Sequence, residues 1–79
     1  MTENTDARMK SLIAEHLCVD LAAVRDESIL IKDLNADSLD VIELTMCFEE
    51  EFKIEITDDE MDAVDTVAEA VALVQKKLG

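Results

Sequence analysis

The sequence contains no proline, tryptophan or tyrosine, and its only glycine is the last of 79 residues. Phe48 and Phe52 are its only aromatic residues, although 49% of the chain is hydrophobic. The core must therefore consist mainly of aliphatic side chains. Because residues that favour strands and tight turns are so scarce, the composition predicts an all-α fold. At this length we expect a single domain spanning residues 1–79, with marginal stability.

Basic residues are also scarce, since 7 Lys and Arg stand against 20 Asp and Glu and give a net charge of −13. The acid is concentrated in residues 33–65, which carry thirteen acidic residues and one basic residue. Such a surface repels nucleic acid and anionic membranes, and it attracts basic protein surfaces. Because these acids repel one another, we expect salt or magnesium to stabilise the fold.

Most kinds of reactive site are missing from the chain. Cys18 and Cys47 have no metal-binding or CxxC spacing, so we expect free thiols in a reducing, cytoplasmic compartment. His16 is the only histidine, and we interpret it as a residue beside an apolar helix face rather than as a ligand. Without a glycine-rich loop or a calcium-loop register, we expect no catalytic site and no dedicated metal site. No signal peptide or apolar run of ~20 residues is visible, so no membrane span is predicted.

Hydrophobic spacing predicts four helices. The first runs from about Asn4 to Leu17, and a long, partly apolar connection over residues 18–35 follows it. The second runs from Ser38 to about Phe52. Capping boxes of the form S/T-x-x-E, which begin at Thr57 and Thr66, open a short helix to about Ala63 and a last helix to about Leu78. We therefore expect a small four-helix bundle, with three main helices and one short one.

The helix from Ser38 has two apolar faces rather than one. One face, expected to be the core face, carries Val41, Leu44, Thr45, Phe48 and Phe52. The other carries Leu39, Ile42 and Met46, flanked by Glu43, Glu49 and Glu50. Two interpretations remain open: a helix that is buried on two sides, or an exposed apolar patch ringed by acids that docks on partners. The second is favoured because the patch begins beside Ser38.

Asp37 and Ser38 mark the start of this helix. Asp37 has the short acceptor side chain of an N-cap residue, which makes Ser38 the first helical residue. The positive end of the helix dipole and the free N–H groups there suit a phosphate or phosphodiester. From position alone, Ser38 could be an ordinary helix-start serine, a kinase substrate or a covalent attachment point.

The stretch Asp33-Leu34-Asn35-Ala36-Asp37-Ser38-Leu39-Asp40 resembles the attachment motif of acyl carrier proteins. The stretches at 49–52 and 56–58 are also similar to those of the family, as are the length and acidity of the chain. The resemblance implies that Ser38 carries a 4′-phosphopantetheine arm, which a phosphopantetheinyl transferase transfers from coenzyme A. Asp37 would help to position the serine. The thiol of the arm would hold acyl groups as thioesters for the enzymes of fatty-acid synthesis, and the protein itself would be no enzyme.

The resemblance also implies a docking surface for basic patches on the transferase, on fatty-acid synthesis enzymes and on acyltransferases. Its residues are Leu39, Asp40, Ile42, Glu43, Met46 and Glu49. We expect a monomer. The chain departs from the family pattern at four positions. It has Asn35 where glycine is usual and Thr57 where proline is usual. It also has Leu30 where an aromatic residue is common and Leu73 near the position where a tyrosine often occurs. These departures leave open a specialised lipid or polyketide carrier. Two alternative functions remain after the carrier function. The second hypothesis is a non-acylated acidic adaptor that binds basic partners, and the third is a calcium buffer.

Overall fold

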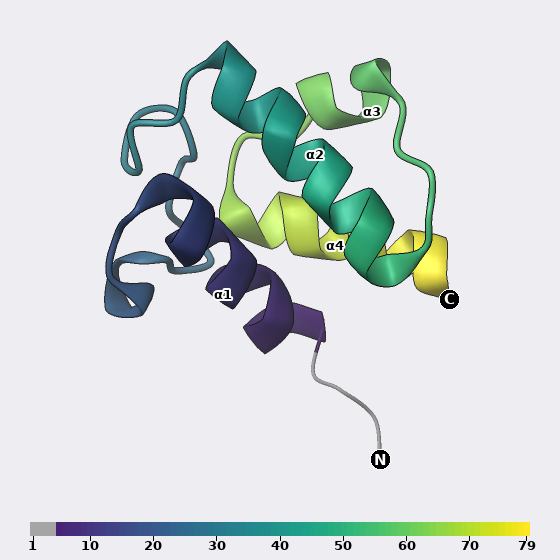
Figure 1. Cartoon of the computed structure of the whole chain (residues 1–79), viewed down its shortest axis with the longest axis horizontal. Helices are drawn as coiled ribbons and strands as arrows, with labels where there is room; N and C mark the ends of the chain where they lie inside the picture. Colours follow the sequence, from purple (N-terminus) through teal and green to yellow (C-terminus); the bar gives the residue numbers. More distant parts are fainter. Residues whose placement is uncertain (1–4) are drawn as a thin grey trace.

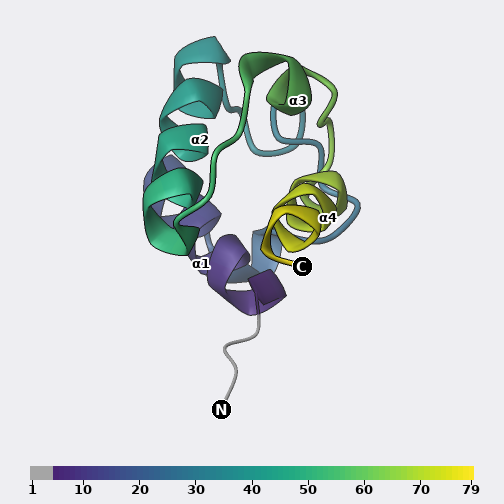
Figure 2. The same ribbon diagram turned by 90° about the vertical axis from the view of Figure 1, so that its right-hand side faces the viewer.

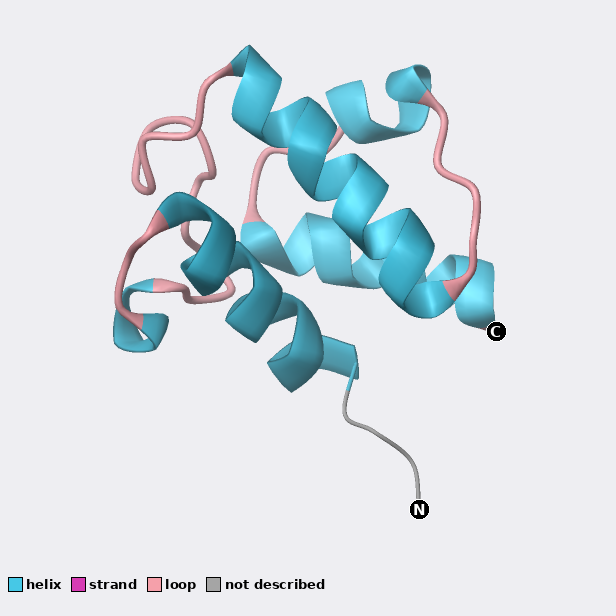
Figure 3. Ribbon diagram, in the orientation of Figure 1, coloured by secondary structure: helices cyan, strands magenta, loops and turns pink. Residues whose placement is uncertain are grey.

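The structure, a computed structural model, describes residues 5–79 and contains only helices and loops in that range (Figure 3). Four α-helices follow one another in the described part of the chain: α1 (Thr5–Leu17), α2 (Ser38–Phe52), α3 (Asp58–Asp62) and α4 (Val67–Leu78). A single 3₁₀ turn, η1 (Leu21–Ala23), lies in the long connection after α1. The predicted all-α architecture is confirmed. The predicted start of the first helix at Asn4 lies outside the described residues.

The helices enclose one aliphatic core. Helix α1 packs against α2 and α4, and α2 also contacts α3 and α4 (Figures 1 and 2). The largest fully buried side chains come from all three long helices: Met9, Ile13, Leu44, Phe48, Val67 and Val74. The predicted core face of α2 is confirmed, because Leu44, Thr45 and Phe48 are buried there. Leu78, the last residue of α4, is exposed.

Side chains close the N-termini of three helices. Thr57 and Thr66 form the two predicted capping boxes at α3 and α4. In the second box, backbone N–H groups of Asp65 and Thr66 donate to the Glu69 carboxylate and hold its pKa below the usual range. Helix α2 carries a third box, formed by Asp37, which the sequence predicted as a cap, and by an aspartate in the N3 position.

Within residues 5–79, three residues other than glycine adopt a left-handed backbone conformation. They are Cys18 after α1, Asn35 before α2 and Lys53 at the C-cap of α2, with φ of 57°, 60° and 57°. The sequence predicted a turn at Asn35, because asparagine tolerates positive φ better than most residues. At Cys18 and Lys53 the side chain adds a conformational cost of roughly 1–2 kcal/mol that glycine would avoid.

Backbone hydrogen bonds attach the long connection to the start of α4. The N–H of Leu30 donates to the Asp65 carbonyl at 3.0 Å, and the N–H of Val67 donates to the Ser28 carbonyl at 2.9 Å. Val24, Leu30 and Leu34 are buried in the core, whereas Leu21 stays exposed. The connection is therefore an ordered, packed segment, and its far end is held in place where α2 begins.

Several of the few basic side chains form ion pairs between segments. Lys10 pairs with Asp26 in the long connection and with Asp6 in α1, and both carboxylates raise the pKa of Lys10. Lys77 in α4 pairs with Glu60 in α3 at 2.8 Å, and together with the Thr57 N–H it lowers the pKa of Glu60. Within residues 5–79, no helix is both long and apolar enough to cross a membrane.

Candidate functional site

The site begins at the N-terminus of α2. The Asp40 N–H donates to Asp37 Oδ1 at 2.8 Å, and the Asp37 N–H donates to Asp40 Oδ2 at 3.2 Å. Ser38 is the first residue of the helix and is exposed. In an α-helix, the N–H groups of Ser38 and Leu39 have no intrahelical acceptor. Ser38, with its hydroxyl group, is therefore an exposed residue at the positive end of helix α2, whose N-terminus carries a capping box.

Hydrogen bonds and buried side chains hold the turn before Ser38 in place. The Ile29 N–H donates to Asp33 Oδ2 at 2.8 Å, and the Ala36 N–H donates to the Leu30 carbonyl at 3.0 Å. The side chains of Leu34 and Ala36 are buried on either side of exposed Asn35. Because these contacts fix the residues directly before it, the serine has a defined position relative to the long connection.

A pocket of about 210 Å³ lies beside this serine, between α2, α3 and the long connection. Ser38, Asp62 and Asp65 line it together with aliphatic side chains, which are Ile29, Leu30, Ile31, Val41, Ile42, Met61 and Val64. An enclosed apolar cavity of ~150 Å³ is large enough to bind benzene, so this partly polar pocket has room for a short hydrocarbon segment against its aliphatic residues. Leu30 is in the pocket wall, whereas Leu73 packs against the core outside the pocket.

The second apolar face of α2 is exposed. Leu39 is 61% exposed, Ile42 52% and Met46 55%. Of the two interpretations of this face, burial on two sides is therefore excluded. Such large apolar side chains in a row on one helix, next to acidic residues, have the composition of a binding surface.

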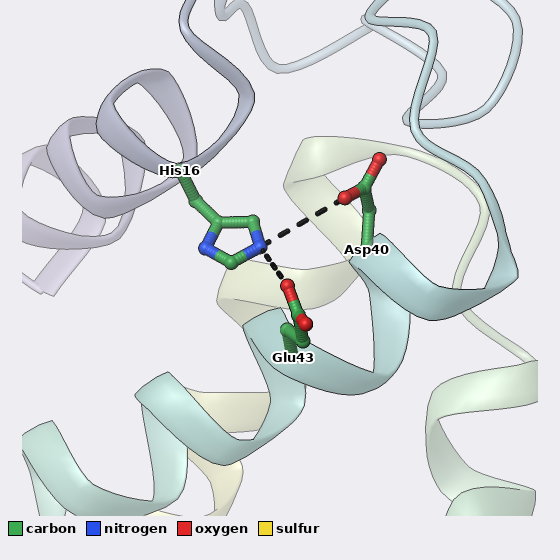
Figure 4. Close-up of side chains that lie close together, drawn as sticks. All are labelled: His16, Asp40 and Glu43. Atoms are coloured by element: carbon green, nitrogen blue, oxygen red, sulfur yellow. Dashed lines mark ion pairs between the residues drawn. The ribbon is translucent and has the colours of Figure 1, made fainter.

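The acidic residues around this face are not equivalent. His16 Nε2, from α1, lies 2.9 Å from Glu43 Oε1 and 3.9 Å from Asp40 Oδ1 (Figure 4). Glu49 accepts the buried Ile56 N–H through Oε2 at 2.8 Å. The sequence predicted the positions of these acids on the helix. It did not show that His16, 24 residues before Asp40, meets two of them, because no local pattern relates residues so far apart.

Comparisons with known proteins agree with this geometry. The sequence family described as "Phosphopantetheine attachment site" matches residues 7–74, a range that includes Ser38. An acyl carrier protein of Phenylobacterium zucineum is 47% identical over 72 residues, which are 91% of each chain. The chain belongs to the acyl carrier protein family. Another such protein, from a Picosynechococcus species, is 46% identical over 79 residues, covering 100% of this chain and 98% of the relative.

The fold of this acyl carrier protein is also that of a solved relative. The crystal structure of an acyl carrier protein from Thermotoga maritima superposes with a TM-score of 0.77 at 38% identity, over 91% of this chain and 84% of the other. The protein is thus a carrier with a phosphopantetheine attachment site, and it is not itself catalytic. The predictions of family, cofactor and carrier function are confirmed.

Proposed function

We propose that Ser38 is the residue that carries the phosphopantetheine arm. The observation that carries this assignment is the exposed serine at the capped start of α2, beside a pocket lined mostly by aliphatic residues. In the loading reaction, Ser38 Oγ attacks the phosphorus next to the pantetheine of coenzyme A, the pyrophosphate bond of coenzyme A breaks, 3′,5′-ADP leaves, and the serine proton passes to solvent or to a base of the transferase. Once attached, the arm supplies a thiol that holds acyl groups as thioesters.

The charges at this helix start suit an arm that must stay mobile. The helix N-terminus stabilises a nearby anion by about 0.3–1 kcal/mol. The carboxylates of Asp37 and Asp40, which share the capping box at this helix start, carry the same sign of charge as the phosphodiester and repel it. Because this repulsion opposes the attraction of the helix N-terminus, the phosphodiester is accepted without being held tightly. In this proposal Asp37 fixes the position of Ser38 through the capping box rather than by acting on the hydroxyl.

The pocket beside Ser38 fits a role in sheltering cargo. Its aliphatic lining would remove part of an acyl chain from water, which is worth about 0.8 kcal/mol for each buried CH₂ group. At about 210 Å³ it takes only the first part of a long chain, so longer cargo requires the helices to move apart. The small energy for each CH₂ group also allows the chain to leave again when a partner enzyme competes for it.

The exposed face of α2 is proposed as the docking surface for partner enzymes, through Leu39, Asp40, Ile42, Glu43, Met46 and Glu49. The acids would attract basic patches on the phosphopantetheinyl transferase, on fatty-acid synthesis enzymes and on acyltransferases, and so raise the association rate. The three exposed apolar side chains give a small contact area, which suits brief complexes. We place these encounters in the cytoplasm, with the carrier acting as a monomer.

Intact mass spectrometry tests the attachment site. The protein is incubated with coenzyme A, magnesium and a phosphopantetheinyl transferase, and its mass should rise by one phosphopantetheine group. Ser38→Ala should gain nothing, whereas Ser11→Ala, which removes an exposed serine on α1, should gain the group as the wild type does. Modification of Ser38→Ala, or an unmodified wild type, would refute the assignment.

A further inference from the structure

A histidine and two carboxylates from different helices meet at one edge of the docking surface. His16 belongs to the last turn of α1, and Asp40 and Glu43 lie three residues apart on α2, so both acids face the same way. Figure 4 shows the imidazole pointing toward the two carboxylates. Within residues 5–79, this is the group of metal-ligating side chains whose ligand atoms all lie within 4.8 Å of one another.

We propose that His16, Asp40 and Glu43 bind a divalent transition metal, with Zn²⁺ as the ion that fits best. Zinc takes histidine nitrogen and carboxylate oxygen at ~2.0–2.2 Å, which places tetrahedral ligand atoms ~3.3 Å apart. The distances from His16 Nε2 to Glu43 Oε1 and to Asp40 Oδ1, 2.9 Å and 3.9 Å, lie on either side of that value. Small side-chain rotations would therefore bring all three donors to one ion.

The capping box uses one carboxylate oxygen of Asp40 and leaves the other available to a metal ion. Asp40 accepts the Asp37 N–H through Oδ2, whereas Oδ1 is the atom that faces His16. Asp40 can therefore bind a metal without giving up its capping hydrogen bond. The side chains of His16, Asp40 and Glu43 are 23%, 33% and 48% exposed, so an ion can reach them and water can take a fourth position.

The donor set separates this site from general binding of cations by an acidic surface. Magnesium and calcium prefer oxygen ligands only, whereas imidazole nitrogen favours zinc and related transition metals. The sequence led us to expect no dedicated metal site, because the calcium-loop register is missing, and to interpret His16 as no ligand, because it is the only histidine. The fold changes that expectation, since it supplies two carboxylates from another helix in place of the missing histidine.

Calorimetry with ZnCl₂ tests the proposal, in excess magnesium to saturate carboxylate-only sites. The full chain should bind one equivalent of zinc, and His16→Gln should bind it at least ~10-fold more weakly, the loss that removal of even an outer-shell partner causes. Two variants serve as matched controls on the same stretch of chain. Glu15→Gln removes a neighbouring carboxylate and Cys18→Ser removes an exposed thiol, and both should keep the wild-type affinity.

Proton NMR gives a second, independent measurement. Because His16 is the only histidine, the chain has a single pair of imidazole carbon-bound proton signals. These signals should move or broaden until one equivalent of zinc has been added and then remain constant. Equal zinc affinity in the wild type and His16→Gln would overturn the proposal, as would imidazole signals that do not change when zinc is added. Either result would show that His16, Asp40 and Glu43 form an ion pair and bind no metal.

If the docking surface acts as proposed above, the metal also has a consequence for partners. It would neutralise Asp40 and Glu43 and tie α1 to the start of α2, and so weaken the attraction of basic partners. Zinc should then slow phosphopantetheine transfer to the wild type by several-fold more than to His16→Gln. Equal slowing of both would refute this consequence, whereas the calorimetric result bears on the metal site alone.

Discussion

Glu49 accepts a hydrogen bond from a buried backbone N–H group, whereas its neighbour Glu50 lies at an exposed position. Its Oε2 atom accepts the backbone N–H of Ile56 at 2.8 Å, and Ile56 is only 6% exposed. This bond holds the segment between α2 and α3 against the end of α2, where Lys53 has already turned the chain through a left-handed conformation. We therefore predict that Glu49→Ala destabilises the protein, although it removes one negative charge from a crowded acidic surface.

The size of the effect follows from the bond. A hydrogen bond to a charged group contributes about 1.5–3 kcal/mol, and a buried N–H without a partner costs about 1–3 kcal/mol. Removal of one negative charge relieves repulsion and regains a few tenths of a kcal/mol. The free energy of unfolding should therefore fall by about 2 kcal/mol in total. For a domain of this size that loss lowers the thermal midpoint by roughly 10 °C. Glu49→Gln keeps an acceptor without the charge, and neutral hydrogen bonds are about half as strong, so it should lose roughly half as much.

Thermal and urea unfolding, followed by circular dichroism, measure this loss. Glu50→Ala is the matched control, because it makes the same charge change one residue further along, at an exposed position. It should stay within about 0.5 kcal/mol of the wild type, as surface substitutions usually do. If Glu49→Ala and Glu50→Ala unfold at the same midpoint, the Glu49 hydrogen bond contributes nothing and the reasoning is wrong.

Three further predictions concern stability. Cys18→Gly should stabilise the fold by about 0.5–1 kcal/mol in urea unfolding, because glycine avoids the left-handed cost at φ 57° while losing somewhat more chain entropy. Glu60→Gln should destabilise the protein at neutral pH. Its folded pKa is lowered from 4.5 by Lys77 and the Thr57 N–H, so the stability that this carboxylate contributes is present above about pH 4.5 and lost as the pH falls through the folded pKa. The gap between the unfolding curves of the wild type and Glu60→Gln should narrow in acid. Finally, the thermal midpoint should rise with salt or magnesium, because the net charge is −13.

Each of these has an outcome that contradicts it. A Cys18→Gly variant less stable than the wild type would mean that the thiol makes contacts worth more than the backbone cost. A gap for Glu60→Gln that stays constant from neutral to acid pH would show that its ionisation is not linked to folding. A thermal midpoint that is flat or falls with added salt would show that repulsion among the acids of residues 33–65 is not a major cost.

Much of the fold follows from local patterns, which a sequence displays directly. The three capping residues Asp37, Thr57 and Thr66 each precede a helix by one residue, and they set helix starts through bonds to groups only three residues away. The left-handed turn at Asn35 is local in the same way. Because such bonds need no tertiary contact, the element order and the position of Ser38 at a helix start could be predicted from neighbouring residues.

Other features depend on contacts between distant segments. No sequence pattern indicates that the long connection bonds to the start of α4 through Leu30 and Val67, or that Leu21 stays outside the core. Whether Leu39, Ile42 and Met46 were buried or exposed also could not be decided, because a helical wheel shows which residues share a face but not what covers it. Only packing leaves that face uncovered.

The sequence by itself determined an all-helical, acidic domain with Ser38 at a helix start, because helix periodicity, caps and charge depend on neighbouring residues, and only its resemblance to a known family pointed to a carrier. The tertiary structure alone decided that Ser38 lies beside a mostly aliphatic pocket, that Glu49 accepts a hydrogen bond from Ile56, and that His16 meets Asp40 and Glu43. The physical reason is distance along the chain: side chains from different helices meet only where the core sets the helices against one another.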